Sequence, residues 1–279
     1  MVVLSLITRN SCSKLKHTPI TLVDVLNSVL QIPFKSLILV DDSIDETPEV
    51  IANWCSANNK EVLIYKGAGN RAIARQLSIS KFVSNFSEEW LMFVDDDVIV
   101  NPGWWEEASS YVKESDVGLI WGLNYDGYKE RIMWLKLLGV NYVNYLIREF
   151  YRRGGTHDTM IRRYVLKNLQ IPQDLHVFED WYILNHVLKR GFKVKIVKAG
   201  VTHYNPWLLP AMGDIRLMAH LARKYGVEGP SAVRLAKSLA GLPLNLYVGV
   251  KGFGIKNGLS RGVRRWLTKV AYRVLLYQS

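Results

Sequence analysis

Residues 93–105 read FVDDDVIVNPGWW. An apolar run at 90–94 precedes three adjacent aspartates, and a second apolar triplet follows them. A short apolar run that ends in polar residues is typical of a buried strand. Residues two apart in an extended chain point to the same side, so Asp95 and Asp97 can place two carboxylates on one divalent cation. A solvated turn is the alternative, because Asp is common after strands.

The surrounding chain alternates between strand-like and helix-like segments. Apolar, β-branched runs predict strands at 2–7, 37–40, 61–65 and 90–94. Helical spacing of apolar residues predicts helices at 21–30, 47–56 and 70–84. This alternation predicts βαβ units and a mainly parallel α/β sheet, in which ligands bind beyond the carboxyl ends of the strands.

The pattern changes after residue 124. We expect one long helix over 131–150, strands at 157–164 and 194–197, a helix at 180–190, and further helices at 215–225, 232–240 and 262–277. A proline-containing segment at 206–210 indicates a boundary. The expected organisation is an α/β domain over residues 1–209 and a helical, basic extension over residues 210–279.

Composition excludes several classes of protein. The 279 residues are 49% hydrophobic and 22% charged, which is typical of a globular chain with a substantial core. The two cysteines lack metal-binding spacing, which argues against a zinc finger and favours a reducing compartment. Residues 1–10 predict a first strand instead of a signal peptide, and no apolar stretch has membrane-spanning length.

The net charge of +11 is concentrated at the C-terminal end. Residues 210–279 hold twelve Lys or Arg against two acids, so the preceding residues carry about +1. Residues 262–277 place apolar side chains, among them Trp266, at helical spacing, with basic side chains opposite. This pattern favours peripheral contact with an anionic membrane surface. An ordinary helix packed on the domain, with solvated charges, is the alternative.

Three further motifs accompany the aspartates. Asp41 and Asp42 follow a predicted strand, Arg71 and Arg75 lie four residues apart on one helical face, and FEDWYILNHVLKRGFKV (178–194) begins a helix with two acids. Together with FVDDDVIVNPGWW and GTHDTMIRR (155–163), they occur in the order and rough spacing found in one known family. The sequence resembles the inverting GT-A glycosyltransferases of family 2 over about residues 2–204.

This resemblance implies a GT-A (Rossmann-like) fold and a nucleotide-diphosphate sugar donor. It assigns donor binding to seven residues: Thr8, Asp41, Asp42, Arg71, Arg75, Asp95 and Asp96. Asp42 would contact the base, and the arginines would offset the pyrophosphate charge. The structural alternatives are that Asp42 and Asp45 cap the next helix and that the arginines lie on a helix surface.

The resemblance also implies a metal site and a catalytic base. Asp95, Asp97 and His203 would hold Mn²⁺ or Mg²⁺, although a lone histidine is as often structural. A carboxylate must take the proton of the acceptor hydroxyl as it attacks the anomeric carbon. We assign this role to Asp180, with Glu179 as the competing choice; both acids also suit the start of a helix.

Other classes fit the sequence less well. TRNSCSKL (8–15) after the first strand lacks the GxGxxG of a dinucleotide-dependent oxidoreductase and the Gly-rich basic loop of a nucleotidyltransferase. Acidic motifs at strand ends disfavour nucleic acid as a partner, although the basic extension would suit it. The sequence-based hypothesis is a metal-dependent transferase acting on a lipid-linked or glycan acceptor, cytoplasmic and peripheral at the inner face of the cell membrane.

Overall fold

The computed structural model describes residues 2–67, 69–128, 132, 135–136, 138–204 and 212–278. The chain forms two compact units, each described here by itself. The first comprises Met1–Gly127 and Leu146–Pro206, and the second comprises Tyr128–Tyr145 and Trp207–Ser279. The boundary predicted between residues 209 and 210 lies outside the described residues.

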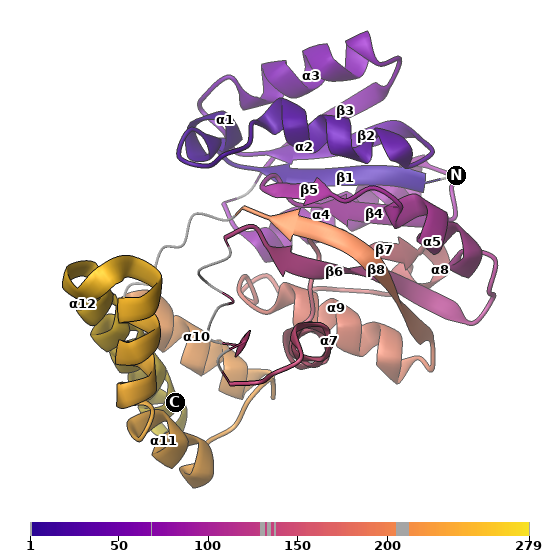
Figure 1. The fold of residues 1–279 in the computed structure, drawn as a ribbon. Coiled ribbons are helices and arrows are strands. Elements are labelled where there is room, and N and C mark those ends of the chain that lie inside the picture. Colours follow the sequence, from indigo (N-terminus) through magenta and orange to yellow (C-terminus); the bar gives the residue numbers. More distant parts are fainter. Residues whose placement is uncertain are drawn as a thin grey trace. The chain divides into compact units, whose positions relative to one another are not determined.

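The first unit is built on one eight-stranded sheet in the order β3-β2-β1-β4-β7-β6-β8-β5 (Figure 1). Its strands are β1 (Val2–Thr8), β2 (Phe34–Asp41), β3 (Glu61–Lys66), β4 (Trp90–Val94), β5 (Val98–Val100), β6 (Val117–Asp126), β7 (Met160–Arg162) and β8 (Lys193–His203). Strands β3, β2, β1 and β4 are parallel to one another, and β6 is parallel to β8, whereas β7 and β5 run antiparallel to their neighbours. The predicted mainly parallel α/β sheet is confirmed.

Helices cover both faces of this sheet, as Figure 1 shows. They are α1 (Ser11–Leu15), α2 (Leu22–Ser28), the 3-10 turn η1 (Val29–Gln31), α3 (Thr47–Ala57), α4 (Arg71–Asn85), α5 (Trp104–Tyr111), α7 (Tyr142–Arg153), α8 (Arg163–Leu166) and α9 (Glu179–Lys189). Trp90, Met92 and Val94 of β4 join the core formed with α2, α3 and α5. Phe93 points to the opposite face, under Arg75 of α4. Every residue of β4 is therefore buried, which explains its uninterrupted apolar sequence.

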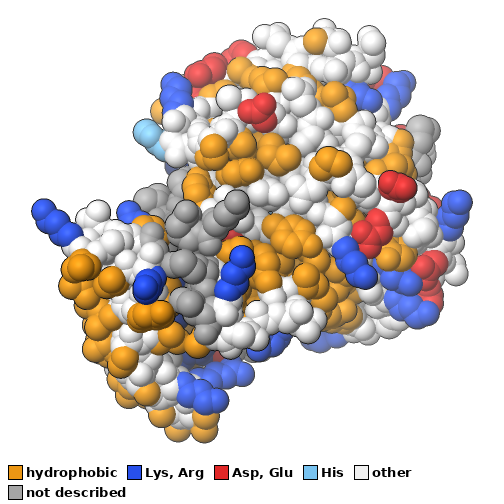
Figure 2. All heavy atoms as spheres, viewed as in Figure 1, with side chains coloured by type: hydrophobic (Ala, Val, Ile, Leu, Met, Phe, Trp, Pro, Cys, Tyr) orange, Lys and Arg blue, Asp and Glu red, His pale blue; other side chains and the backbone are white. Residues whose placement is uncertain are grey.

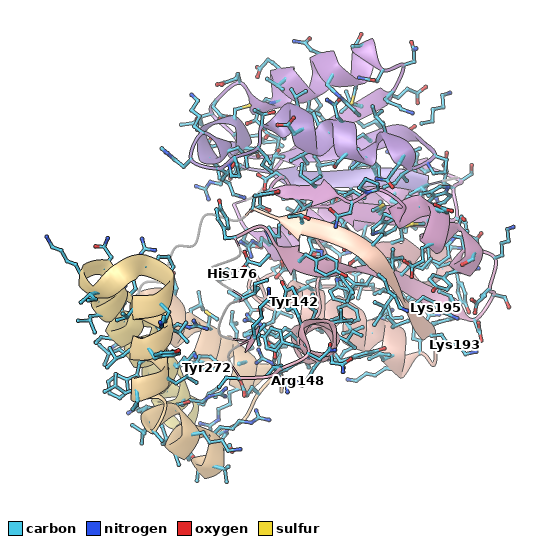
Figure 3. The ribbon with its side chains drawn as sticks, in the orientation of Figure 1. Tyr142, Arg148, His176, Lys193, Lys195 and Tyr272 are labelled. Carbon is cyan, nitrogen blue, oxygen red and sulfur yellow. The ribbon has the colours of Figure 1, made fainter. Side chains whose placement is uncertain are left out.

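Strand β8 lies between β6 and the edge strand β5. At its start, Lys193 pairs with Asp116 at 2.5 Å and Lys195 with Glu114 at 2.8 Å, both in the turn before β6; Figure 3 labels the two lysines. These exposed pairs contribute little stability by themselves. They lie at the end of the sheet where Val117 of β6 is aligned with Lys193 of β8.

Two predicted elements differ from the structure. The single helix expected over 131–150 is interrupted, because Gly139 adopts a positive φ of 64° and α7 begins only at Tyr142. Residues 131, 133, 134 and 137 of that prediction lie outside the described part of the chain. The strand expected over 157–164 is confined to β7, because Arg163 already begins α8.

The second unit consists, in its described part, of helices α10 (Met212–Lys224), α11 (Ala232–Leu239) and α12 (Leu242–Gln278), together with parts of 128–145. The buried carboxylate of Glu228 pairs with Arg234 and Arg273 and lies 3.3 Å from the Tyr272 hydroxyl, which Figure 3 labels on α12. Burial acts to raise the pKa of Glu228, but the two arginines lower it overall. This cluster ties α12 to the segment that leads into α11.

Gly200 provides a test of the packing between β6 and β8. Its φ is +56°, and a Cβ atom there would lie 2.0 Å from the backbone oxygen of Leu123. We expect Gly200→Ala to lower the free energy of unfolding by roughly 3 kcal/mol or more, because backbone strain and a backbone clash add. Gly191→Ala is the matched control, since Gly191 also has a positive φ but open space around it. Urea unfolding measures both, and equal losses would contradict the clash.

Candidate active site

The predicted site residues of β1, β2, β4 and β8 gather at one edge of the sheet. Strand β7 is antiparallel to both β4 and β6, so β6 and its parallel neighbour β8 point the same way as β4. The carboxyl ends of parallel strands share an edge. Thr8, Asp41, Asp95 and His203 therefore all lie at the same edge.

Each of the three adjacent aspartates has a cationic partner. Asp95 Oδ1 accepts a hydrogen bond from Arg75 Nη2 at 2.7 Å. Lys14 Nζ lies 2.8 Å from Asp96 Oδ1 and 2.8 Å from Asp97 Oδ2. His203 Nε2 lies 2.9 Å from Asp97 Oδ1. The like charges that seemed crowded in the sequence are neutralised by side chains from three other segments.

The pKa values of these groups follow from the pairing. Burial acts to raise the pKa of Asp97, but His203 and then Lys14 lower it below its ordinary value. The pKa of Asp95 is likewise lowered by Arg75 against the effect of burial. Burial acts to lower the pKa of His203, yet Asp97 raises it overall. The aspartates that flank Asp96 are thus held ionised.

Strand register explains how His203 reaches Asp97. The antiparallel pairing of β5 with β8 aligns Val98 with His203, and the Tyr204 amide donates to the Asp97 carbonyl at 2.8 Å. Residues far apart in the sequence are thereby opposite each other. The structure brings the predicted histidine to the predicted metal ligand.

The end of β2 separates the two neighbouring aspartates. Asp41 Oδ1 accepts hydrogen bonds from the hydroxyls of Thr8 and Ser43, both at 2.6 Å, so Thr8 and Asp41 are joined. Among the described residues, no side-chain hydrogen bond involves Asp42. Its Cβ packs close to Gly67, since a Cβ atom added to Gly67 would lie 3.0 Å from it. Asp42 is therefore available to a ligand, whereas Asp41 shapes the loop.

Asp45 has a local structural role next to α3, although the N-cap of that helix is Glu46. Its carboxylate accepts from the Thr47 amide at 3.2 Å and from the Ser13 amide at 2.9 Å. It thus fixes the start of α3 and the adjacent α1 segment, in agreement with the local role of Asp before helices.

Glu179 and Asp180 form an acidic pair beside the arginines. Burial, followed by the charge of Asp180, raises the pKa of Glu179 to about 8. Burial also raises the pKa of Asp180. The pKa of Arg71, whose side chain is exposed, is raised by Glu179, Asp95 and Asp180 against the effect of desolvation. Arg71 and the acidic pair therefore belong to the same site as Asp95.

Buried polar atoms at this site lack partners within the described residues. They are Nε and Nη1 of Arg75 and Oε2 of Glu179. A buried donor or acceptor without a partner is costly, and its presence in a native fold calls for an explanation. A polar ligand or ordered water that binds between α4 and the aspartates would satisfy the Arg75 donors.

A buried hydrogen-bond network around Asp158 lies next to the site, and the sequence did not predict the roles of its residues. Asp158 Oδ2 accepts from Trp104 Nε1 at 2.8 Å, and Asp158 Oδ1 lies 2.8 Å from His157 Nδ1. The His157 carbonyl in turn accepts from the Asp95 amide at 3.1 Å. Gly122 leaves room for this carboxylate, since a Cβ there would lie 1.8 Å from Asp158 Oδ2. The network fixes the backbone that carries Asp95.

Lys14 and Ser11 are the other residues that the sequence did not single out. Ser11 Oγ donates to Asp96 Oδ2, while Lys14 bridges Asp96 and Asp97. The available signal was their position in the first strand-to-helix connection, which lies at the ligand-binding edge of a parallel sheet.

The donor set is compatible with a divalent cation. Adjacent ligands of an octahedral Mg²⁺ are about 3 Å apart, given bonds of about 2.1 Å, and Asp97 Oδ1 and His203 Nε2 are 2.9 Å apart. No group of three or more His, Cys, Asp or Glu among the described residues could hold a metal by itself. A cation here would therefore need oxygen ligands from a substrate, as Mg²⁺ sites with one or two carboxylates commonly do.

Comparison with known proteins identifies the family. The family model described as Glycosyl transferase family 2 matches residues 16–168, more than half of the chain. The chain belongs to this family, and it is a glycosyltransferase. A search of curated proteins finds no match to it. Family membership favours a glycosyltransferase over the oxidoreductase, nucleotidyltransferase and nucleic-acid-binding alternatives.

Solved structures confirm the GT-A fold. A mannosyltransferase from Pyrobaculum calidifontis, solved with GDP-Man and Mn²⁺, superposes with a TM-score of 0.60 at 14% identity, covering 99% of this chain and 86% of that one. S. aureus TarS 1–349 with UDP-GlcNAc gives 0.55 at 15% identity, covering 99% and 90%. Glucosyl-3-phosphoglycerate synthase from Mycobacterium tuberculosis, with Mn²⁺ and UDP, gives 0.50 at 15%, covering 83% and 81%. At these identities the likeness shows the fold alone.

The raised pKa of Glu179 predicts a pH-dependent stability. The folded state keeps a proton on Glu179 up to about pH 8, whereas the unfolded chain releases it near pH 4.3. Stability contributed by this group is therefore lost as pH rises through that window. We expect the free energy of unfolding of Glu179→Gln to match that of the wild type at or below about pH 4 and to exceed it by more than about 1 kcal/mol near pH 8.5, measured by urea unfolding. Glu106→Gln, at an exposed position on α5, is the control. Parallel pH profiles for Glu179→Gln and the wild type would show that Glu179 is ionised in the folded state.

Proposed function

We propose that this chain is a metal-dependent, inverting glycosyltransferase that transfers a sugar from a nucleotide-diphosphate sugar to a hydroxyl of a lipid-linked or glycan acceptor. The observation that carries the proposal is the convergence of Asp95, Asp97, Arg75 and His203 at one sheet edge, beside an acidic pair with raised pKa values. Family membership and the nucleotide complexes of similar folds support it.

The donor would bind across the ends of β1, β2 and β4. We assign its base to Asp42, whose carboxylate is not engaged by the described residues, and its ribose to the loop that Thr8 and Asp41 shape. We assign Arg71 and Arg75 to the charge of the diphosphate, since Nε and Nη1 of Arg75 lack partners among the described residues. Asp95 and Asp96 would contact the ribose and sugar. Guanidinium groups suit this role because they donate two parallel hydrogen bonds to phosphate oxygens.

Asp97 and His203, with Asp95 nearby, would hold the Mn²⁺ or Mg²⁺ ion. When bound, such an ion supplies positive charge that stabilises the departing diphosphate. The protein supplies the rest: Arg71 and Arg75 add positive charge, and the buried network under Asp95 keeps the carboxylates in place. Preorganised charges of this kind need no rearrangement as the leaving group develops charge.

Asp180 is our choice for the base. It is half-buried, with one oxygen accepting from the Trp181 amide, whereas Glu179 is only 3% exposed. Burial and the neighbouring charge of Asp180 raise the pKa of Glu179 to about 8, and burial raises the pKa of Asp180 as well. A carboxylate whose pKa is raised is a stronger base toward the acceptor hydroxyl. Attack from the face opposite the nucleotide inverts the anomeric centre.

The test is turnover of a panel of nucleotide sugars with Mn²⁺, measured as the release of nucleoside diphosphate. We expect Asp180→Asn to lower kcat by about 100-fold to 10,000-fold because no base remains, while donor affinity changes less than about threefold. NMR of the product should show an inverted anomeric configuration.

The comparison variants separate the roles. Asp97→Ala should lose turnover together with the effect of Mn²⁺ on donor affinity, whereas Glu179→Gln should retain more kcat than Asp180→Asn. Weakened donor binding in Asp180→Asn would place that residue on the donor side. The absence of turnover with every sugar in the panel, in a protein whose thermal unfolding no donor shifts, would count against the function itself.

We also propose that α12 makes peripheral contact with an anionic membrane surface, which would place the enzyme at the inner face of the cell membrane. None of the described helices is long and apolar enough to cross a membrane. Gly254, with φ of 75° and ψ of 170°, divides α12 into two arms, 242–253 and 255–278. The arms pack so closely that a Cβ on Gly249 would lie 2.1 Å from the Gly258 oxygen. The helix is therefore an antiparallel hairpin.

The second arm exposes an apolar stripe. Ile255, Leu259, Val263 and Leu267 follow one another at intervals of four residues and are 39–72% exposed. Lysines and arginines on the same hairpin supply positive charge; they are Lys251, Lys256, Arg261, Arg264, Arg265 and Lys269. Figure 2 shows hydrophobic side chains with Lys and Arg among them on the viewed face of the C-terminal helices. Apolar burial together with attraction to anionic lipid is how interfacial helices bind.

Liposome sedimentation tests this contact. Ile255→Asp with Leu259→Asp should reduce binding to vesicles rich in phosphatidylglycerol by about tenfold or more, because it removes apolar area and adds negative charge. Ile44→Asp is the matched control, since Ile44 in the first unit is also exposed, at 94%. Equal binding by all three proteins, or equal binding to neutral vesicles, would contradict the proposal.

A further inference from the structure

Lys14 occupies the position where two of the three aspartates meet. Its ammonium lies 2.8 Å from Asp96 Oδ1 and 2.8 Å from Asp97 Oδ2. The side chain comes from α1, a five-residue helix directly after β1, and it is 33% exposed. The Lys14 side chain is thus mostly covered, although not fully buried.

Both Asp97 oxygens have protein partners: Oδ2 lies 2.8 Å from the Lys14 ammonium and Oδ1 lies 2.9 Å from His203 Nε2. The Oδ1–His203 spacing suits two ligands of one cation, so the ammonium beside Oδ2 is the contact that opposes cation binding. A cation that takes Asp97 must displace the ammonium or bind next to it. Because like charges repel strongly where water is partly excluded, the second course is disfavoured.

A nucleotide donor would offer the ammonium a second partner. The proposed diphosphate would lie at the same edge, beside Arg75 and the aspartates. Lysine binds phosphate as a compact point charge on a flexible four-carbon stem, so its ammonium can move while the backbone stays in place. Asp96 retains the Ser11 hydroxyl as a partner when the ammonium leaves.

We infer that Lys14 couples donor binding to metal binding. Without donor, its ammonium holds Asp96 and Asp97 and keeps a divalent cation off Asp97. When the donor binds, the ammonium moves to the diphosphate and releases the Asp97 carboxylate to the cation. The inference rests on the proposed function, since it requires a diphosphate donor and a metal.

The coupling can be measured by equilibrium binding without any turnover. Mn²⁺ is titrated into the full chain alone and with saturating GDP or UDP, with free Mn²⁺ followed by electron paramagnetic resonance. In the wild type we expect weak Mn²⁺ binding alone and much tighter binding with nucleotide. In Lys14→Met, Mn²⁺ alone should bind at least about tenfold tighter, equivalent to about 1.4 kcal/mol. Nucleotide affinity in EDTA should fall about tenfold, because the phosphate partner is lost.

Two further variants separate this role from general effects of charge and from misfolding. Lys16→Met removes an exposed lysine of the same segment and should leave both affinities within about twofold of the wild type. Lys14→Arg keeps the charge and should retain weak Mn²⁺ binding without nucleotide. Thermal unfolding of each variant verifies that the fold is retained.

The inference is overturned if Lys14→Met binds Mn²⁺ alone as weakly as the wild type, or if Lys16→Met tightens Mn²⁺ binding equally. A Lys14→Met protein that fails to fold leaves Lys14→Arg to decide, since tight Mn²⁺ binding by that variant would also contradict it. These outcomes are distinct from failure of the proposed function, in which neither nucleotide binds the wild type and no sugar is transferred.

Discussion

Neutralisation of three adjacent carboxylates is the constraint on which the first unit depends. Asp95, Asp96 and Asp97 leave the end of β4 in consecutive positions, and Asp96 and Asp97 are almost fully buried. Isolated buried charges are far too costly for a marginally stable fold, so each needs a partner. Arg75 comes from α4, Lys14 from α1 and His203 from β8. The strand order that places these segments at one edge is thus tied to the electrostatics of the site.

The pKa values of the acidic pair, Glu179 and Asp180, shift in the opposite direction from those of Asp95 and Asp97. Glu179 and Asp180 are close to arginines, yet burial raises the pKa of both, and the charge of Asp180 raises that of Glu179 further. Asp95 and Asp97 have lowered pKa values. Titratable groups whose environments push their pKa values apart are suited to different chemical roles. Carboxylates held ionised suit cation and donor binding, and carboxyl groups with raised pKa values suit base catalysis. The proposed division of roles follows from this contrast.

The second unit has its own physical basis. Glu228 joins Arg234, Arg273 and Tyr272, and glycines allow the two arms of α12 to approach closely. Close helix packing directs small residues inward and leaves larger apolar side chains outside. The charge excess of the C-terminal residues and the exposed stripe thereby appear on one hairpin. This combination, which neither feature provides alone, supports a membrane surface as its partner.

Local sequence patterns predicted the mainly parallel α/β sheet, the polar residues at the strand ends and the acidic pair that begins α9. These features depend on short-range periodicity and on residue types that neighbouring positions reveal. Those patterns did not predict that β5 runs antiparallel to β8 or that β7 runs antiparallel to β4 and β6. They also did not predict the interruption at Gly139 or the role of Lys14. Such features arise from contacts between distant segments: Lys14 contacts Asp96 across 82 residues, and its position after the first strand does not reveal that partner. Only tertiary structure decides them, because the partner of a buried charge is set by where strands lie in the sheet and not by what is adjacent in the chain.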